Sequence, residues 1–347
     1  MTQPIRLAVD AHDLERDWRD ISRYLRALLE RFARRDDLAL TLLVRDFFVP
    51  HARGALAVIL GTDRFRVSRS VPSDTEVIWH PWNGTFFKSP YPAIATMHDA
   101  VPFAYPNPDA LKRENEQEPF RRSVNSACIL VNSAFTEREI QHYLGIAPER
   151  TRVTLLAVED AFTPAGPQAR AERPYVLFIG AIENRKNFAT LAAAHARAFP
   201  DGSVALVCAG DRPPPTPGIV SLGSLDRDAL IPWYRGALAT AVPSLYEGFG
   251  FLALEAMACG SPVIVATGSS LDEVCGDAAL SIDRATDVDA WAEALRAVAS
   301  VATLRSRLRA AGLERARSFS WDRCAEQTHS AITDVYRAAY TSSSRST

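Results

Sequence analysis

Short apolar runs alternate with longer helical patterns along most of this 347-residue chain, and this alternation limits the fold more than any other feature. Parallel strands must be joined by a long crossover connection, which is usually a helix. Repeated strand and helix segments therefore predict an α/β fold with doubly wound parallel sheets. In the first half, helical periodicity covers Trp18–Arg34 and Arg113–Ala127, and β-type runs occupy residues 5–9, 38–44, 76–80, 93–97, 128–132 and 152–158.

The alternation stops once and then restarts, which predicts two domains. Residues 160–174 lose periodicity and gather prolines, alanines and charges, as linkers do. We then expect strands at 175–180, 204–210, 239–244 and 262–266, helices beginning near 188, 226 and 250, and a helical end from 288 to about 340. The predicted organisation is an N-terminal domain over 1–160, a linker over 161–174, a second domain over 175–325, and a C-terminal helix with a frayed tail over 326–347.

Composition excludes several classes of protein. The formal charge of −2 provides no basic field for binding nucleic acid. No window reaches the roughly 20 continuous apolar residues that span a bilayer, which predicts a cytoplasmic protein. Five cysteines form no CxxC pair and leave an odd one, so we expect buried thiols in a reducing cytosol rather than disulfides or a zinc site. These are Cys128, Cys208, Cys259, Cys275 and Cys324.

Two cations stand at a predicted junction between strand and helix. Within residues 178–187, a predicted buried strand ends at Gly180. A short loop then carries Arg185 and Lys186 just ahead of a helix. Adjacent cations near backbone N–H groups make an anion site suited to phosphate. A solvated cation pair at a helix start explains the spacing equally well, because no phosphate-binding glycine motif accompanies it.

Two glutamates mark the stretch SLYEGFGFLALEAMACGSPVI, residues 244–264. Glu255 falls among leucine, alanine and methionine, where a charge is costly unless it is paired or bound. If Glu247 lies just before the helix, the two carboxylates face the same side about 12 Å apart. Carboxylates accept strong hydrogen bonds from hydroxyls, which favours a polyol ligand. The alternative is structural, with Glu255 capping a neighbouring element and Glu247 solvated.

Taken together, these segments resemble the retaining glycosyltransferases of family 4, and among them the bacterial mannosyltransferase-like members. PSLYEGFGFLALEAMACGSPVI is similar to the family's EGFGLPxLEAMAxGxPVI block, and LFIGAIENRKNFATLAAAHA resembles its pyrophosphate-binding strand, loop and helix. TMHDAVPFAYP and IWHPWNG resemble segments on the acceptor side. The resemblance covers most of residues 75–325. It implies the GT-B fold, which has two facing Rossmann-like doubly wound domains, a cleft between them and a C-terminal helix that crosses back.

The resemblance also implies a role for each residue of the donor motifs. Arg185 and Lys186 would hold the diphosphate of the donor. Glu247 would contact hydroxyls of the transferred sugar, and Glu255 would bind the ribose. The strand end and the backbone at the start of the helix would complete the donor site, which adds Gly180, Gly248, Phe249, Gly250 and Phe251. The expected catalytic residues are Arg185, Lys186, Glu247 and His98.

His98 and Asp99 follow a predicted strand, and the resemblance places them near the transferred sugar or the acceptor. A lone histidine is more often structural, but the His-Asp pair after AIATM favours a functional role. Asn83 is a further candidate on the acceptor side. One departure concerns the acceptor: many members have a glycine-rich first loop, whereas residues 14–24 contain no glycine and several bulky charged side chains. The acceptors of glycine-rich members are therefore not carried over.

The first helix carries a basic face that has two interpretations. A solvated basic face is the default. The alternative is docking to an anionic membrane that carries a lipid-linked acceptor, which would make the protein peripheral at the inner face of the cell membrane. The arginines on or beside this helix are Arg19, Arg23, Arg26, Arg34 and Arg35.

The resemblance implies a retaining, metal-independent hexosyltransferase that needs no cofactor and transfers a sugar from a nucleotide diphosphate donor to an acceptor hydroxyl. GDP-mannose is the first expected donor and a UDP-sugar the second. The expected acceptor is a saccharide or lipid-linked saccharide of bacterial surface polysaccharide or glycolipid assembly. Two alternatives remain: an epimerase or phosphorylase would act without an acceptor, and a non-catalytic subunit would bind nucleotide sugars without transferring them.

Overall fold

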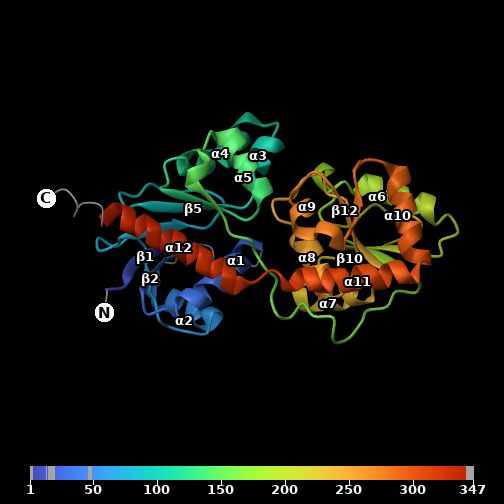
Figure 1. Cartoon of the computed structure of the whole chain (residues 1–347), viewed down its shortest axis with the longest axis horizontal. Coiled ribbons are helices and arrows are strands. Elements are labelled where there is room, and N and C mark those ends of the chain that lie inside the picture. The colour runs from blue at the N-terminus through green and yellow to red at the C-terminus, as the bar shows by residue number, and fades with distance from the viewer. Residues whose placement is uncertain (1–2, 13, 15–19, 46–48, 341–347) are drawn as a thin grey trace. The chain divides into compact units, whose positions relative to one another are not determined.

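The computed structural model describes residues 3–12, 14, 20–45 and 49–340. The chain divides into two compact units (Figure 1). Unit 1 comprises Met1–Leu156 and Ser320–Thr347, and unit 2 comprises Ala157–Phe319. The expected linker, residues 161–174, thus falls inside unit 2, and the expected C-terminal helix belongs to unit 1 from Ser320 onward. The expected frayed tail from residue 342 lies outside the described residues.

Unit 1 is built on a parallel sheet of seven strands in the order β3-β2-β1-β4-β5-β6-β7. Because β4 and β6 are buried along their whole length, they read as continuous apolar runs rather than as alternating ones. The strands are β1 (Ile5–Asp10), β2 (Leu38–Leu43), β3 (Arg66–Ser68), β4 (Val77–His80), β5 (Ala93–Met97), β6 (Cys128–Val131) and β7 (Thr151–Val153). The helices are α1 (Asp20–Phe32), α2 (Val49–Leu60), α3 (Val101–Ala104), α4 (Ala110–Ser123) and α5 (Ala134–Leu144), with the 3₁₀ turn η1 (Pro148–Arg150) and the later α12 (Trp321–Tyr340).

Unit 2 is built on a second parallel sheet, of six strands in the order β10-β9-β8-β11-β12-β13. Its strands are β8 (Tyr175–Gly180), β9 (Ala205–Gly210), β10 (Ile219–Gly223), β11 (Ala239–Val242), β12 (Val263–Ala266) and β13 (Leu280–Ile282). Its helices are α6 (Phe188–Ala198), α7 (Arg227–Gly236), α8 (Phe251–Ala258), α9 (Ser270–Cys275), α10 (Val288–Ser300) and α11 (Ala302–Arg317), with the 3₁₀ turns η2 (Asn184–Lys186) and η3 (Gly276–Ala278). The two parallel sheets confirm the predicted α/β class.

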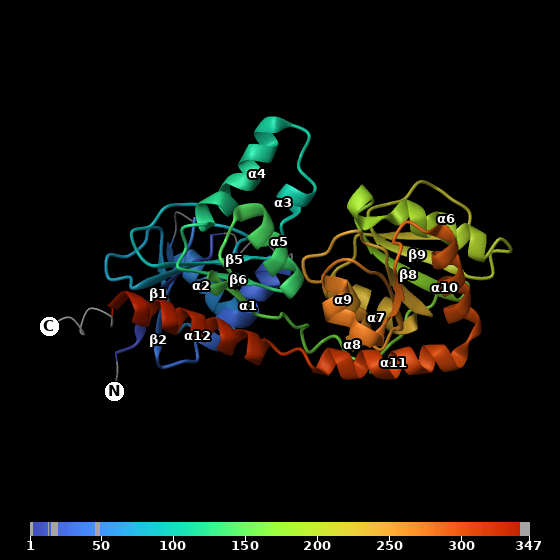
Figure 2. The same ribbon diagram turned by 45° about the horizontal axis from the view of Figure 1, so that its top comes forward.

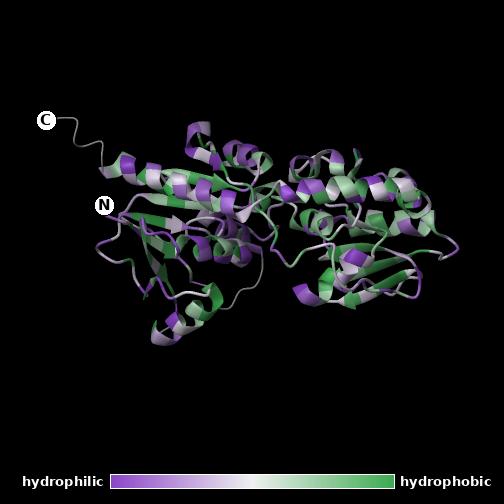
Figure 3. Ribbon diagram, turned by 60° about the horizontal axis from the view of Figure 1, so that its bottom comes forward, coloured by the Kyte–Doolittle hydropathy of each residue, from purple (hydrophilic) through white to green (hydrophobic). Residues whose placement is uncertain are grey.

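Alternate residues of β8 show how the sheet of unit 2 is covered on both faces. Val176 and Phe178 belong to the hydrophobic cluster that also contains the buried residues of α6 and α10. Tyr175 and Leu177 pack in the opposite cluster, with α7 and α8. Figure 2 shows α6 and α10 side by side. The hydropathy colouring agrees, because the strands are mostly hydrophobic and the helices carry hydrophilic residues as well (Figure 3).

The helical end of the chain, predicted from 288 to about 340, consists of the three helices α10, α11 and α12. The first two, α10 and α11, belong to unit 2, whereas α12 returns to unit 1 and contacts α1, β4, β5 and β6 (Figure 1). Arg152 at β7 donates to Asp334 of α12 at 2.8 Å. The predicted return of a C-terminal helix is therefore confirmed. Among the described helices, none has the length and apolar character that crossing a membrane requires.

Candidate active site

The predicted phosphate-binding cations Arg185 and Lys186 lie in η2, the 3₁₀ turn between β8 and α6. Asn187 follows in the left-handed conformation, with φ of 54°, and is buried. Its side-chain amide donates to the backbone oxygens of Pro243, at 3.1 Å, and Ala285, at 2.7 Å. The bond to Pro243 holds the turn that carries both cations against the loop that follows β11, and the bond to Ala285 ties it to the loop that follows β13.

The loop between β11 and α8 is fixed from two directions. The backbone N–H of Leu245 donates to the carbonyl of Arg185 at 2.8 Å. On the other side, the Ser270 hydroxyl donates to the carbonyl of Glu247 at 2.8 Å. These two hydrogen bonds fix the backbone on both sides of Tyr246 and so hold Glu247 next to η2.

The structure brings Arg185, Lys186 and Glu247 together. Nζ of Lys186 lies 2.6 Å from Oε1 of Glu247, and the guanidinium of Arg185 lies 3.9 Å from Oε2. Arg185 also donates to the Tyr246 carbonyl at 3.2 Å and to the Glu183 carboxylate at 2.6 Å. The side chains of Lys186 and Glu247 are only 14% and 13% exposed, so their charges act with less screening than surface charges. A diphosphate binding here would share Lys186 with Glu247.

The start of α8 presents backbone rather than side chains beside Glu247. Gly250 is the N-cap residue, with φ of 103°, and a Cβ there would lie 2.7 Å from Cδ2 of Leu271. Phe249 and Phe251 are buried and pack edge to face, with ring centroids 5.3 Å apart. Their rings therefore anchor the loop, and glycine at position 250 allows the positive φ and the close contact with Leu271 at the N-terminus of the helix.

Gly180 ends β8 next to the cations. Its φ of 141° favours glycine, and a Cβ there would meet the Lys186 side chain at 3.9 Å. The predicted grouping of this strand end with Lys186 agrees with this geometry. The ligand that the group binds stays a prediction.

Glu255 differs from the sequence expectation in its surroundings. The side chain lies on α8 in a residue that is 2% exposed, and Oε2 accepts a hydrogen bond from the Tyr234 hydroxyl of α7 at 2.8 Å. Glu247 and Glu255 thus have different partners in the protein. This bond to a neighbouring helix corresponds to the structural alternative, and the ribose-binding role stays a prediction.

In unit 1, the three predicted acceptor-side residues meet after β5. The Asn83 side chain accepts from the backbone N–H of His98 at 2.7 Å and donates to Asp99 at 3.4 Å. Asp99 also accepts from the backbone N–H of Val101 at 2.9 Å. Asn83 has φ of 65°, which asparagine tolerates better than most residues. Asn83 therefore connects the two loops at the ends of β4 and β5.

The ring of His98 is buried and takes part in internal contacts. Nε2 lies 2.9 Å from the Pro81 carbonyl, and the ring packs edge to face with Tyr24 at 4.9 Å. Burial lowers the pKa of His98, and the bond with Pro81 and the charge of Asp99 only partly offset that effect. His98 follows β5 as predicted, and its ring has the structural partners of a satisfied histidine. Its catalytic role and its position near the transferred sugar or the acceptor stay predictions.

Acidification is expected to destabilise the fold, because two histidines are buried. Burial lowers the pKa of His195 in unit 2 as it lowers that of His98 in unit 1. Both histidines titrate below the ordinary value of 6.5 in the folded protein, so the unfolded chain binds more protons below that pH. Their contribution to stability is present above pH 6.5 and is lost as the pH falls through the folded pKa values. Thermal unfolding midpoints at about pH 7.5 and about pH 5.5 test this, and the difference should shrink in His98→Gln. An unchanged difference would contradict the assignment to His98.

Sequence reasoning missed a second group at the same edge of unit 1, formed by Asp10, His12 and His80. Val9 pairs with Trp79 in the parallel β1 and β4 ladder, so Asp10 and His80 end the two strands side by side. Nδ1 of His12 lies 2.5 Å from Oδ1 of Asp10. Their position at or just beyond the carboxyl ends of the predicted strands 5–9 and 76–80 was the available signal, since ligands bind at the carboxyl ends of strands in such sheets.

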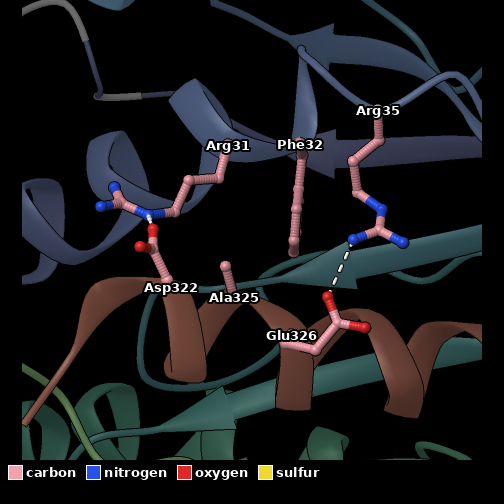
Figure 4. Close-up of a pocket in the computed structure, with 6 residues that line it drawn as sticks. All are labelled: Arg31, Phe32, Arg35, Asp322, Ala325 and Glu326. Atoms are coloured by element: carbon pink, nitrogen blue, oxygen red, sulfur yellow. Dashed lines mark hydrogen bonds and ion pairs between the residues drawn. The ribbon is translucent and has the colours of Figure 1, made fainter.

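Arg35 of the predicted basic face, and the nearby Arg31, form contacts within unit 1. Arg31 pairs with Asp322 at 2.6 Å, and Arg35 pairs with Glu326 at 2.9 Å, across a small cavity between α1 and α12 (Figure 4). The cavity is lined by Arg31, Phe32, Arg35, Asp322, Ala325 and Glu326. Arg19 lies outside the described residues, as do residues 15–18 of the glycine-free first loop. Membrane contact through this helix stays a prediction.

In the described parts of the chain, no group of three histidine, cysteine, aspartate or glutamate residues could hold a metal ion. All five cysteines are buried free thiols, as expected. Burial raises the pKa of Cys208 and Cys275 to about 12. These thiols are therefore protonated and unreactive near neutral pH.

Comparison with known proteins connects this geometry to one family. The family model "Glycosyl transferases group 1" matches residues 173–300, which contain η2 and the loop before α8. The O-antigen chain mannosyltransferase B of Escherichia coli is 32% identical over 265 residues, which are 68% of this chain and 68% of that protein. The D-inositol 3-phosphate glycosyltransferase of Nocardioides sp. is 42% identical over 117 residues, 33% of this chain and 24% of that protein.

Solved structures match nearly the whole chain. The sucrose-phosphate synthase of Thermosynechococcus elongatus has a TM-score of 0.72 at 20% identity and covers 97% of this chain and 100% of its own. The Anabaena protein Alr3699/HepE, in complex with UDP and glucose, has a TM-score of 0.70 at 14% identity and covers 95% of this chain and 100% of its own. At these identities the structures establish the fold, which confirms the predicted GT-B class. With the mannosyltransferase match over two thirds of both chains, this chain belongs to the glycosyl transferases group 1 family.

Proposed function

We propose that the protein is a retaining, metal-independent hexosyltransferase. It transfers a sugar from a nucleotide diphosphate sugar to a hydroxyl of a saccharide or lipid-linked saccharide in bacterial surface polysaccharide or glycolipid assembly. The observation that carries the proposal is the cluster of Lys186, Arg185 and Glu247, with 2.6 Å between Lys186 and Glu247, beside the glycine-capped start of α8.

The cluster suits a diphosphate leaving group for electrostatic reasons. Breaking the bond between the sugar and the phosphate places negative charge on the departing diphosphate. Arg185 and Lys186 stabilise that charge, and the N-terminus of α8 adds its partial positive charge. The cations supply the electrophilic assistance that a metal ion gives in other sites, and this supports a metal-independent reaction.

The transfer itself needs no covalent intermediate on the protein. The acceptor oxygen forms a bond to the anomeric carbon on the face that the diphosphate leaves, while the bond from that carbon to the phosphate oxygen breaks. The acceptor proton passes to the departing phosphate. The products are a glycoside with the donor's anomeric configuration and a nucleoside diphosphate.

Glu247 and the relatives bear on the choice of donor. Ser270 holds the backbone carbonyl of Glu247, and Lys186 holds its carboxylate. That carboxylate can accept hydrogen bonds from hydroxyls of the transferred sugar. The E. coli relative is named a mannosyltransferase, which favours GDP-mannose as the first donor. The structurally similar Anabaena protein is in complex with UDP and glucose, which makes a UDP-sugar the second.

A thermal unfolding screen with GDP-mannose, UDP-glucose and related nucleotide sugars tests the donor. A ligand at 100 times its dissociation constant stabilises the folded protein by about 2.7 kcal/mol, which gives a measurable rise in the unfolding midpoint. We expect one nucleotide sugar to give a larger rise than the others. No rise with any of them at millimolar concentration would overturn the proposal.

Substitution of Glu255 tests the ribose-binding role apart from the structural one. If Glu255 accepts hydrogen bonds from ribose, Glu255→Gln should weaken binding of GDP or UDP by about tenfold or more, the effect of losing a charged hydrogen bond. Tyr234→Phe is the matched control, because it removes the hydroxyl that donates to Glu255 but keeps the carboxylate. Calorimetric titration gives both affinities. Equal affinities in Glu255→Gln and the wild type would leave Glu255 a structural residue.

A further inference from the structure

The group formed by Asp10, His12 and His80 in unit 1 has no role in the donor chemistry described above. Asp10 is 1% exposed, and a buried carboxylate is costly unless it is paired. Burial by itself would raise its pKa, but the hydrogen bond of His12 and the proximity of both imidazoles outweigh burial and leave the pKa of Asp10 below its usual value. Asp10 is therefore an anion held between two imidazoles.

His12 is arranged by Asp10 in a defined way. With Asp10 ionised, Nδ1 of His12 carries the proton that bridges to Oδ1 at 2.5 Å. Nε2 of a neutral ring is then a hydrogen-bond acceptor, and it has no hydrogen-bond partner among the described residues. The ring packs edge to face on Phe87, with centroids 5.6 Å apart, and its side chain is 17% exposed. Asp10 and Phe87 therefore fix the orientation of a ring that stays partly exposed.

His80 is a second, independent sign of an incomplete polar site. Its ring is 1% exposed, and Nδ1 has no hydrogen-bond partner among the described residues, although it lies 3.7 Å from Oδ2 of Asp10. An unpaired buried polar atom is uncommon and calls for an explanation. The ring also packs on Phe87, at 4.8 Å. Two imidazoles, one carboxylate and an aromatic ring thus gather at the ends of β1 and β4.

We infer that Asp10 and His12 form a dyad that binds a hydroxyl of a saccharide acceptor through Nε2 of His12. The inference rests on the proposed function and adds a subsite to it. Sugar hydroxyls donate to imidazole nitrogens, and aromatic rings such as Phe87 pack against the apolar faces of sugars. Asp10 is a positioning residue, because it fixes the tautomer and orientation of His12. Asn83 lies in the loop that follows β4, and His98 and Asp99 follow the next strand of the sheet, β5.

Nitrogen-15 NMR of the full chain labelled at its seven histidines tests the dyad. The probes are the methyl glycosides of mannose, glucose and galactose in both anomeric forms, added to protein that is saturated with GDP or UDP. We expect at least one glycoside to shift Nε2 of His12 saturably. In Asp10→Asn, the Nδ1-protonated tautomer of His12 should be lost and the dissociation constant of that glycoside should rise by roughly three- to tenfold, as for one lost hydrogen bond.

His12→Gln and His12→Leu keep the test decisive if Asp10→Asn fails to fold. The Gln side chain retains a hydrogen-bond acceptor and should bind the glycoside better than Leu does. His142→Gln, at an exposed histidine of α5, is the matched control and should bind as the wild type does. If no glycoside shifts His12, or if the His12 variants bind glycoside unchanged, the inference is wrong. Failure of GDP and UDP to bind in the same samples would instead contradict the proposed function.

Discussion

Lys186→Ala is expected to lower turnover by roughly 10²- to 10³-fold at saturating donor, the usual effect of removing one group that stabilises transition-state charge. Lys186 lies at the end of η2, and Glu247 holds its Nζ in place. This cation is therefore the one best placed to stabilise the negative charge that develops on the leaving diphosphate. Release of nucleoside diphosphate, measured by a coupled assay, gives the rate.

The chain offers a close control for this substitution, because it has only two other lysines, Lys88 and Lys112. Lys112 lies exposed on α4, so Lys112→Ala should keep wild-type turnover. Lys112→Ala should unfold near the wild-type midpoint, since an exposed side chain contributes little to stability. Lys186→Ala also removes the ion pair with Glu247, so turnover is compared at a temperature below both unfolding midpoints. Turnover of Lys186→Ala equal to that of Lys112→Ala would remove Lys186 from the mechanism.

Glu247→Gln is expected to lower kcat/KM by roughly 10- to 150-fold, which corresponds to losing a hydrogen bond to a charged group worth about 1.5–3 kcal/mol. The amide keeps the size of the side chain but cannot hold both Lys186 and a sugar hydroxyl as strongly as the carboxylate can. Initial rates at varied donor concentration measure the effect.

Glu183→Gln separates the sugar contact from the ion pair. Glu183 pairs with Arg185 at 2.6 Å, as Glu247 pairs with Lys186, but its side chain is 47% exposed. Exposed pairs contribute roughly 0–1 kcal/mol, so this variant should lose less than about fivefold in kcat/KM. A loss as large as that of Glu247→Gln would show that pairing with the cations, and not the sugar, accounts for Glu247.

The sequence predicted the architecture where segments were long and periodic. Strands such as β8 and β9 are apolar on both faces, and helices such as α1 show a clear apolar face, so their positions followed from pattern alone. The three-residue edge strands β3 and β13 escaped prediction, because a short run at a sheet edge buries too little to leave a pattern. Helix α5 was also missed, although Ser133 caps it and Gly145 ends it.

The sequence predicted which residues belong to the candidate site, but it did not predict which of them contact one another. Spacing placed Arg185 and Lys186 before a helix, but only the fold shows that Asn187 ties their turn to the loop of Glu247. The burial of Glu255 was foreseen, whereas its partner Tyr234 lies 21 residues away on another helix. Asp10 and His80 are 70 positions apart in the sequence, so no local pattern could join them.

The central claim is that the protein transfers a sugar from a nucleotide diphosphate sugar with retention. Proton NMR of a reaction containing the stabilising donor and a methyl glycoside acceptor tests it most directly, because the anomeric signals of donor and product are resolved. The account predicts loss of the donor, release of the nucleoside diphosphate, and a new glycosidic signal with the donor's anomeric configuration. A product of inverted configuration would contradict retention, and conversion of the donor in the absence of any acceptor to an epimer would contradict sugar transfer.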